Sequence, residues 1–302
     1  MLAKFAAFLL LSLATALTWL PWPLLRRMAD GLAWLWGRLD ARESRVARRN
    51  LELAYPHLAP AERDAMHADV LRGTARQAFE TLRIWTRPQA SNLALIREQD
   101  GVDLFDAALA SGRGVIVAAP HYGNHELVIA WMAARGPFAL VYRAPETAYG
   151  DRFLRLARDG ENVVLVPAEA SAMRPLLKAL QAGGAVGITP DQQPKEGAGD
   201  FAPFFGRPAQ TLTLVPRLAR RTGATVLAVY AERRADGLFD VHVEPVDAAV
   251  GGDDPAAALA AMNAAVERIA RRDMSQYQWT YKRFSRRPPG SAEPNPYRQD
   301  FR

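Results

Sequence analysis

Short apolar runs alternate with helical patterns from about residue 102 onward, and this alternation constrains the fold more than any other feature. The expected strands cover 114–119, 138–142, 163–166, 185–189, 225–232 and 238–244. The expected helices cover 102–111, 125–135, 147–159, 170–182, 211–221 and 255–272, with a Pro- and Gly-rich loop at 190–209. Strands that alternate with helices indicate an α/β fold with a mixed, largely parallel central sheet flanked by helices.

The N-terminus is unlike the rest of the chain. No charged residue occurs from Phe5 to Leu25, a run that would measure about 30 Å as a helix and so match the hydrocarbon thickness of a bilayer. Trp19 and Trp22 stand near its end, as in an interfacial aromatic belt, and basic residues follow. We therefore expect an N-terminal hydrophobic membrane-anchor helix, with the rest of the chain in the cytoplasm.

Two alternatives to a spanning anchor stay open. Pro21 and Pro23 are expected to end the helix near Leu20, so that the segment either spans the membrane or lies in its interface. A cleaved signal peptide is the main competitor, but the apolar run is long for one and lacks a clean cleavage site before a polar start.

Charge and composition narrow the class of partner. The chain has no cysteine, which excludes disulfides and thiol catalysis, and its formal net charge is +6. Basic residues gather between residues 26 and 50 and again between 282 and 302. Such clusters suggest acidic partners, such as phospholipid head groups, a phosphorylated substrate or an acidic protein. No nucleic-acid motif accompanies the charge, so we expect no nucleic-acid partner.

These patterns divide the chain into four parts. Helical patterns at 28–39, 43–54 and 60–86 fill the stretch between the anchor and the α/β region. The predicted parts are a membrane anchor (1–25), a helical N-terminal segment packed on the core (26–100), an α/β core (101–285) and an irregular basic tail (286–302).

The sequence HYGNHE at 121–126 stands where a strand should end and a helix begin. Asn124 is a good helix N-cap, which places Glu126 in the first helical turn. The intervening loop is short enough for the His121 imidazole and the Glu126 carboxylate to meet. That pair would be a general base with its orienting anion, and the nucleophile would be a hydroxyl group of the substrate.

Two other interpretations of this motif stay open. A histidine at a strand end is often only a hydrogen-bonded loop residue, and a glutamate at a helix start often only complements the helix dipole. His121, His125 and Glu126 also resemble metal ligands, but position 129 is Ile, so the H-E-x-x-H pattern is absent. We expect neither a metal nor another cofactor.

Three polar residues follow expected strands. His121, Arg143 and Asp191 each lie at or just beyond a strand end. Because the carboxyl ends of parallel strands meet at one edge of a sheet, and sites form there, these residues should converge. This convergence favours a functional role for His121 independently of its motif.

Seven segments, in order over some 240 residues, carry a family resemblance. They are RRNLELAYP (48–56), FETLRIW (79–85), GRGVIVAAPHYGNHE (112–126), VYR (141–143), GITPDQQP (187–194), FAPFFGRPAQT (201–211) and QYQWTYKRF (276–284). Together with the apolar N-terminus, they resemble the late, or secondary, acyltransferases of lipid A biosynthesis, within the lysophospholipid acyltransferase superfamily.

The resemblance implies a reaction and its partners. A fatty acyl chain would pass from the thioester of acyl carrier protein to a hydroxyl of a lipid A precursor, a phosphorylated glycolipid. His121 would remove the hydroxyl proton, and Glu126 would stabilise the imidazolium. The enzyme would sit at the bacterial inner membrane with its catalytic domain facing the cytoplasm.

The resemblance also implies substrate-binding residues. Arg143 and Arg158 stand where the family places arginines, and a guanidinium suits phosphate, although Arg158 also reads as a helix-surface charge. Asp191 is expected to order the active-site loop or hold an arginine, without a role in proton transfer. Arg283, in the terminal W-x-x-[RK]-R block, would face the precursor's phosphates or the carrier protein.

Departures from the family pattern leave the acceptor open. His125 stands where Trp or Leu is common, and Tyr281 where His is frequent. The same chemistry on another glycolipid or on a lysophospholipid is therefore an alternative, as is a membrane lipid-binding protein that has lost catalysis. The intact pair of His121 and Glu126 counts against the last. Phe204 and Phe205 would line an acyl channel or simply pack in the core.

Overall fold

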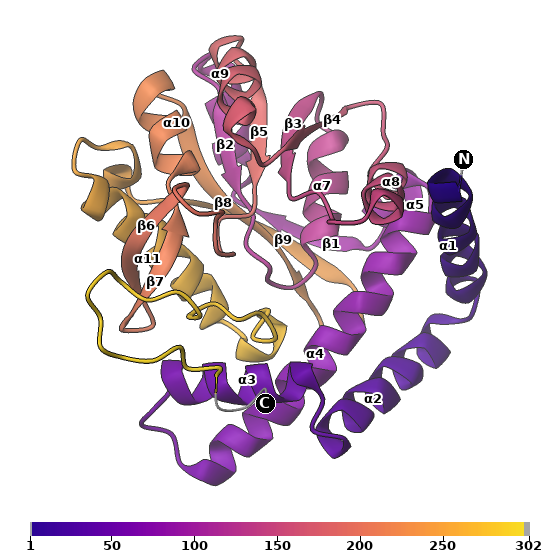
Figure 1. Cartoon of the computed structure of the whole chain (residues 1–302). Helices are drawn as coiled ribbons and strands as arrows, with labels where there is room; N and C mark the ends of the chain where they lie inside the picture. Colours follow the sequence, from indigo (N-terminus) through magenta and orange to yellow (C-terminus); the bar gives the residue numbers. More distant parts are fainter. Residues whose placement is uncertain (1, 299–302) are drawn as a thin grey trace.

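A seven-stranded sheet forms the centre of the computed structural model, which describes residues 2–298 (Figure 1). The strand order is β1-β9-β8-β2-β5-β3-β4, and every neighbouring pair is parallel except β8 and β9. The strands are β1 (Ile96–Asp100), β2 (Val115–Ala118), β3 (Phe138–Tyr142), β4 (Val163–Pro167), β5 (Ala185–Ile188), β8 (Thr225–Arg233) and β9 (Phe239–Pro245). The predicted mixed, largely parallel sheet is confirmed.

Helices cover both faces of the sheet (Figure 1). Alternate residues of β2 point to opposite sides, so Val117 joins an apolar cluster with α6 and α7, whereas Ile116 joins another with α9, α10 and α11. The helices are α1 (Leu2–Thr18), α2 (Trp22–Arg38), α3 (Arg42–Ala54), α4 (Pro60–Thr86), α5 (Gln89–Leu93), α6 (Val102–Ala110), α7 (His125–Ala133), α8 (Ala148–Ala157), α9 (Met173–Gln181), α10 (Leu214–Thr222) and α11 (Pro255–Ala270).

Two features differ from the sequence prediction. β1 has the polar sequence IREQD and lies at the sheet edge with four exposed residues, so no apolar pattern marks it. It nevertheless pairs with β9, which extends the sheet into the stretch predicted to be only helical. The predicted loop at 190–209 contains the antiparallel strand β6 (Gly199–Phe204) and the start of β7 (Arg207–Leu212). A proline in each strand and a glycine at the start of β6 hide this hairpin from a pattern search.

The apolar N-terminus is broken into two helices. The pair of α1 and α2 is bent by 111° at the short break between the two helices. Pro21 occupies the N-cap position of α2, and Pro23 lies in the first turn of this helix. Among the described residues, no single helix has both the length and the apolar character needed to cross a membrane, although this bent pair meets the test when taken together. A spanning anchor helix is therefore not confirmed.

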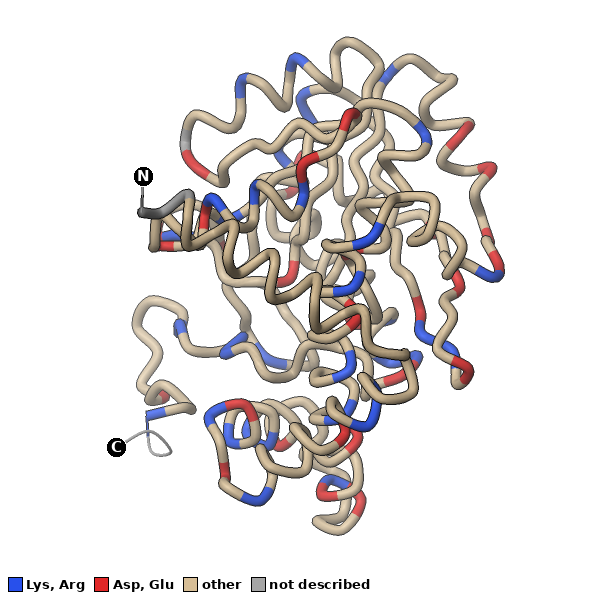
Figure 2. The backbone as a smooth tube through the Cα atoms, turned by 90° about the vertical axis from the view of Figure 1, so that its right-hand side faces the viewer, with Lys and Arg blue, Asp and Glu red and all other residues tan. Residues whose placement is uncertain are grey.

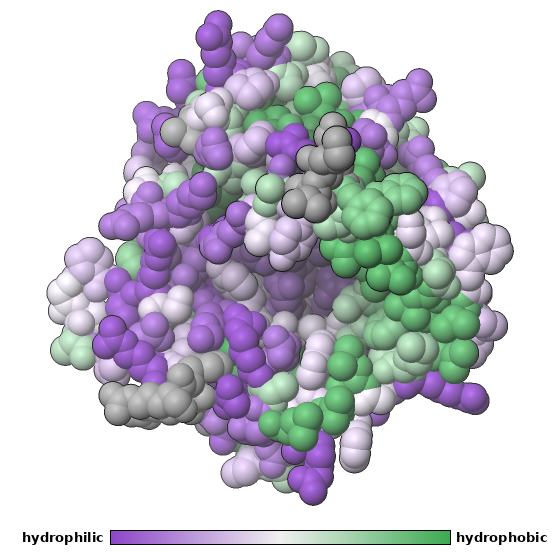
Figure 3. Space-filling model, turned by 45° about the vertical axis from the view of Figure 1, so that its right-hand side comes forward, coloured by the Kyte–Doolittle hydropathy of each residue, from purple (hydrophilic) through white to green (hydrophobic). Residues whose placement is uncertain are grey.

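α1 lies against the body of the protein, next to α4 and α8 (Figure 1). The hydroxyls of Thr18 and Thr86 are 2.7 Å apart, and Arg87 donates a 2.7 Å hydrogen bond to the carbonyl of Thr18. Large apolar side chains on the outer side of α1, α2 and the break between them are more than half exposed: Phe5, Phe8, Leu13, Trp19 and Trp34. Figure 3 shows the apolar surface that these helices form.

The C-terminal segment is irregular and packs on α3. Lys and Arg recur along it (Figure 2). Asn50 of α3 donates hydrogen bonds to the carbonyls of Trp279 (2.6 Å) and Tyr281 (2.7 Å), and accepts one from the Tyr297 hydroxyl (2.5 Å). Residues 299–302 of the predicted tail lie outside the described residues.

Candidate active site

The ends of three adjacent parallel strands bring the predicted site residues together. β2 lies beside β5, and β5 beside β3, with Ala118 level with Ile188. His121, Asp191 and Arg143 follow these strands at the same edge of the sheet. The convergence predicted from the sequence is confirmed.

The loop that carries His121 is held by backbone contacts. Gly123 has a φ of 55° and lies so close to β8 that an added Cβ would be 1.9 Å from the carbonyl oxygen of Ala231. Only glycine fits this approach. Asn124 then caps α7, as predicted, by accepting a 3.2 Å hydrogen bond from the amide of Leu127. The imidazole of His121 therefore projects from a fixed backbone.

Asp191 is the carboxylate that contacts His121. Its Oδ1 lies 2.8 Å from His121 Nδ1, and its Oδ2 accepts a 2.9 Å hydrogen bond from the backbone amide of His121. Burial would raise the pKa of Asp191, but the imidazole and amide of His121 hold it below its ordinary value. The ionised carboxylate only accepts, so Nδ1 carries a proton, and in the neutral ring the lone pair is on Nε2.

Glu126 contacts Arg158 and His125 instead. Its carboxylate accepts hydrogen bonds from Arg158 Nη2 (2.5 Å) and Nε (3.1 Å), and His125 Nε2 lies 3.3 Å away. Burial opposes ionisation, yet Arg158 and then His125 hold the pKa of Glu126 well below its usual range. The predicted contact between His121 and Glu126 is thus corrected: the first turn of α7 directs Glu126 towards the end of α8, whereas Asp191 reaches His121 from the neighbouring strand.

His125 is a neutral neighbour of the pair. Its ring centroid is 4.7 Å from that of His121, and its Nδ1 is 3.3 Å from the Gln77 side-chain amide. Burial lowers the pKa of His125, and the effect exceeds the opposite effect of Glu126. The site therefore holds one charged pair, Glu126 with Arg158, beside two imidazoles.

A small cavity of about 160 Å³ opens beside His121 on the α7 side of the sheet. Its polar lining includes His121, His125 and Arg158. The rest is largely apolar: Ala119, Val128, Ile129, Met132, Leu140, Leu154, Gly187 and Ile188. We call it the α7 cavity.

A larger cavity of about 560 Å³ lies on the other side, between α9, the 192–198 loop and the start of α10. We call it the α10 cavity. Three cations and two acids line it: Arg143, Lys195, Arg217, Glu169 and Glu196. Both cavities share the strand-end residues Val141, Tyr142, Arg143, Ile188, Thr189 and Gln192. The two cavities therefore meet over the carboxyl ends of β3 and β5.

Gln192 stands at this junction. Its side-chain Nε2 is 3.2 Å from His121 Nε2 and donates a 3.0 Å hydrogen bond to Gln278. The free lone pair of His121 is therefore capped by an amide that borders both cavities. Sequence reasoning missed Gln192, although its place in PDQQP, directly after a strand, was a usable signal.

The predicted arginines occupy three different environments. Arg143 is exposed at the junction of the cavities, and within residues 2–298 its side chain makes no hydrogen bond or ion pair. Arg158 lines the α7 cavity, with a side chain only 13% exposed, so it is not a surface charge.

Arg283 lies apart from both cavities. It is 4% exposed, donates to the carbonyl of Gln210 and the hydroxyl of Thr211, and sits over the Phe204 ring. This position gives no support to its predicted role in substrate binding. Phe204 and Phe205 likewise pack in an aromatic core with Trp279 rather than along either cavity.

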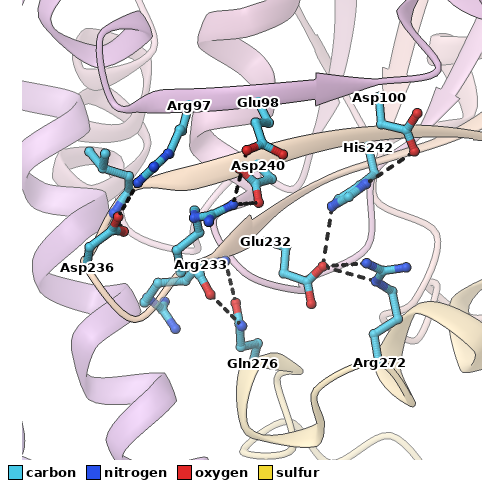
Figure 4. Close-up of polar contacts among 12 residues, drawn as sticks. Arg97, Glu98, Asp100, Glu232, Arg233, Asp236, Asp240, His242, Arg272 and Gln276 are labelled. Carbon is cyan, nitrogen blue, oxygen red and sulfur yellow. Dashed lines mark hydrogen bonds and ion pairs between the residues drawn. The ribbon is translucent and has the colours of Figure 1, made fainter.

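A second polar network supports the loop that carries His121. Glu232, near the end of β8, accepts a 2.8 Å hydrogen bond from Arg272 and lies 3.4 Å from His242 (Figure 4). It also accepts a 2.9 Å hydrogen bond from the Tyr122 hydroxyl. Burial opposes its ionisation, but His242, Arg272 and Tyr122 lower the pKa of Glu232 to about 2. Because Tyr122 follows His121, this anion holds the loop at a second point besides Asp191.

An α/β fold with a histidine–carboxylate pair at the sheet edge is typical of an enzyme in which histidine acts as a general base. Comparison with known proteins makes the class specific. The chain belongs to the bacterial lipid A biosynthesis acyltransferase family, whose sequence model matches residues 1–286, and it is an acyltransferase.

Individual relatives share about a quarter of their residues with it. The lipid A biosynthesis lauroyltransferase of Escherichia coli K12 is 28% identical over 90% of this chain and 88% of its own length. The palmitoleoyltransferase of the same organism is 28% identical over 91% and 94%. A phosphatidylinositol mannoside acyltransferase of Mycobacterium tuberculosis is 28% identical over 77% and 76%.

Proposed function

We propose that this protein transfers a fatty acyl chain from the thioester of acyl carrier protein to a hydroxyl group of a phosphorylated lipid A precursor. One observation carries the proposal: His121 Nε2 faces the junction of two cavities that lie on opposite sides of the sheet. Acyl transfer needs two substrates to meet at one base, and each of the two cavities gives one substrate a route to His121.

We assign the part of the acyl chain next to the thioester to the α7 cavity, because about half of its lining residues are aliphatic and its volume of about 160 Å³ suits a short length of hydrocarbon. The head group of the acceptor fits the α10 cavity, which is larger and carries three cations. A phosphorylated sugar needs polar and cationic contacts, whereas a hydrocarbon chain gains free energy by leaving water. The lining of the α7 cavity therefore suits the acyl chain of the donor, and the lining of the α10 cavity suits the phosphorylated acceptor.

His121 acts as the general base in this scheme. The acceptor hydroxyl displaces the Gln192 amide from His121. The hydroxyl then gives its proton to His121 Nε2 while the hydroxyl oxygen attacks the thioester carbonyl. The tetrahedral intermediate collapses, the carbon–sulfur bond breaks, and the imidazolium returns the proton to the departing thiolate. Asp191 holds the Nδ1–H tautomer and stabilises the imidazolium, a role first predicted for Glu126.

Glu126 acts on the reaction through Arg158. Arg158 lines the α7 cavity, and its guanidinium is fixed by two hydrogen bonds to Glu126. A positive charge held in a partly dry cavity stabilises the oxyanion that develops on the thioester carbonyl. Both predicted residues therefore act at the site in this scheme, His121 with Asp191 and Glu126 with Arg158.

The exposed apolar side chains of α1 and α2 support a location at a membrane surface. We propose the cytoplasmic side of the bacterial inner membrane, where a lipid acceptor and a soluble carrier protein can both reach the site. α1 packs on α8, and α8 contributes Leu154 to the α7 cavity, so the membrane-facing surface and the cavity are neighbours.

Transfer of the acyl chain to a different lipid acceptor is the alternative function, and one of the relatives favours it. The mycobacterial relative is named for phosphatidylinositol mannoside, a different glycolipid. Purified protein should be given acyl carrier protein thioesters with either a phosphorylated lipid A precursor or a mannosylated or lyso-phospholipid, and the products weighed by mass spectrometry. We expect an added acyl chain on the lipid A precursor. Acylation of only the other lipids would select the alternative, and no product from any acceptor would overturn both.

Arg143→Ala is expected to weaken use of the phosphorylated acceptor by roughly 10–100-fold, because a charge-assisted hydrogen bond to phosphate contributes about 1.5–3 kcal/mol. Arg143→Lys should recover part of the loss. The measurement is kcat/KM for each substrate titrated separately. The matched control is Arg113→Ala, another exposed arginine, at the opposite edge of the sheet. A change confined to the carrier-protein dependence would assign Arg143 to the donor instead.

A further inference from the structure

The side-chain amide of Gln192 has a partner at the site for each of its two N–H groups. The amide nitrogen lies 3.2 Å from His121 Nε2 and donates a 3.0 Å hydrogen bond to Gln278 Oε1. The direction of the first contact follows from the tautomer of His121, because a lone pair on Nε2 can only accept. Gln192 therefore holds a donor against the atom that takes the proton of the acceptor hydroxyl.

The backbone that carries Gln192 is fixed by the C-terminal segment. The next residue, Gln193, donates a hydrogen bond of 3.0 Å from its backbone amide to the Tyr281 hydroxyl. The backbone amide of Gln278 donates a 3.0 Å hydrogen bond to the carbonyl of His121. One segment thus contacts both the loop of Gln192 and the loop of His121, so the spacing between the amide and the base is set before a substrate arrives.

The proposed reaction leaves one N–H of Gln192 without its partner. The acceptor hydroxyl takes the place of the amide at His121 Nε2, whereas the bond to Gln278 remains. Gln192 borders both cavities, so the freed N–H lies at their junction, beside the oxygen that attacks the thioester. An oxyanion develops there on the thioester carbonyl, and donors that are already held in place stabilise such a charge most strongly.

We propose that Gln192 is a catalytic donor to this oxyanion and that Gln278 is the residue that positions it. The inference rests on the proposed function, because it takes the reaction at the junction to be acyl transfer. Attack moves an electron pair of the carbonyl double bond onto its oxygen, and the Gln192 N–H donates a hydrogen bond to that oxygen while keeping its proton. When the double bond forms again and the carbon–sulfur bond breaks, the N–H returns to His121. Arg158, which lines the α7 cavity, is the other donor to the same oxygen.

Gln192→Met keeps the approximate size of the side chain but removes the donor. It is expected to lower kcat by about 10²–10³-fold with little change in KM, because the lost hydrogen bond forms only in the transition state. Steady-state rates with acyl carrier protein thioester and a phosphorylated lipid A precursor give both constants, and thermal melts check folding. Gln192→Ala should show the same loss and replaces Gln192→Met if that variant does not fold. The matched control is Gln181→Ala, an exposed glutamine at the end of α9 and outside both cavities, which should behave as the wild type.

Gln278→Ala tests the positioning role. It is expected to lower kcat by up to about 10²-fold, because the amide of Gln192 is present but no longer held in direction. The double variant of Gln192→Met and Gln278→Ala should be no slower than Gln192→Met alone, since the two residues act as a unit. Additive losses in the double variant would overturn the positioning role of Gln278.

The opposite result for Gln192 is equally clear. If Gln192 only caps His121, its removal frees the base, and a folded Gln192→Met or Gln192→Ala variant with a kcat at or above the wild-type value would overturn the inference. A higher KM with an unchanged kcat would also overturn it, and would assign Gln192 to substrate binding. Absence of transfer by the wild type with every acceptor would instead overturn the proposed function, and this inference with it.

Discussion

His121→Ala is expected to slow acyl transfer by about 10²–10⁴-fold, the usual contribution of a general base. The variant loses Nε2, the only atom of the pair that faces the cavity junction. It should still fold, because the loop is also held by Gly123, by the Asn124 cap and by Tyr122 on Glu232. Single-turnover rates with the purified variant measure the effect, with circular dichroism as the check on folding.

The matched control is His57→Ala, since His57 is an exposed histidine away from both cavities. It should transfer acyl chains at the wild-type rate. If the folded His121→Ala variant also does so, another group takes the hydroxyl proton, and the assignment of His121 is wrong.

Glu126→Gln is expected to lower the free energy of unfolding by about 3–5 kcal/mol, because it leaves the guanidinium of Arg158 buried without an anion. The two side chains are only 2% and 13% exposed. Chemical denaturation of the purified variant measures the loss. Adding Arg158→Met should recover part of the stability, because the double variant no longer holds an unpaired buried charge.

Asp69→Asn serves as the control for this experiment. It breaks the pair of Asp69 and Arg72, whose side chains are about half exposed, and such pairs contribute about 0–1 kcal/mol. Equal losses from Asp69→Asn and Glu126→Gln would show that the Glu126 pair is no more important for stability than a surface contact. Recovery of stability without recovery of acyl transfer in the double variant would separate the structural role of the pair from its proposed role at the oxyanion.

The sequence predicted the buried strands because both of their faces are covered. β2, β3 and β5 are continuous apolar runs, and each was placed within a residue or two. β1 was missed because an exposed edge strand can be entirely polar. The β6–β7 hairpin was missed because proline and glycine in its strands resemble a loop.

The candidate site was predictable in its position but not in its contacts. Strand ends fix where His121, Arg143 and Asp191 lie, since parallel neighbours share one edge. Which carboxylate reaches His121 depends on how the loops turn after those ends. Asp191 is 70 residues away along the chain, and Glu126, although only five away, faces Arg158. Side-chain direction, not sequence distance, decides the pairing.

The most direct test of the central claim, that His121 held by Asp191 is the base for acyl transfer, is the rate of transfer by Asp191→Asn. Asparagine keeps the size of the side chain but removes the anion that fixes the Nδ1–H tautomer and stabilises the imidazolium. We predict that the folded variant loses about 10²–10⁴-fold in kcat. A wild-type rate in folded Asp191→Asn would contradict the account.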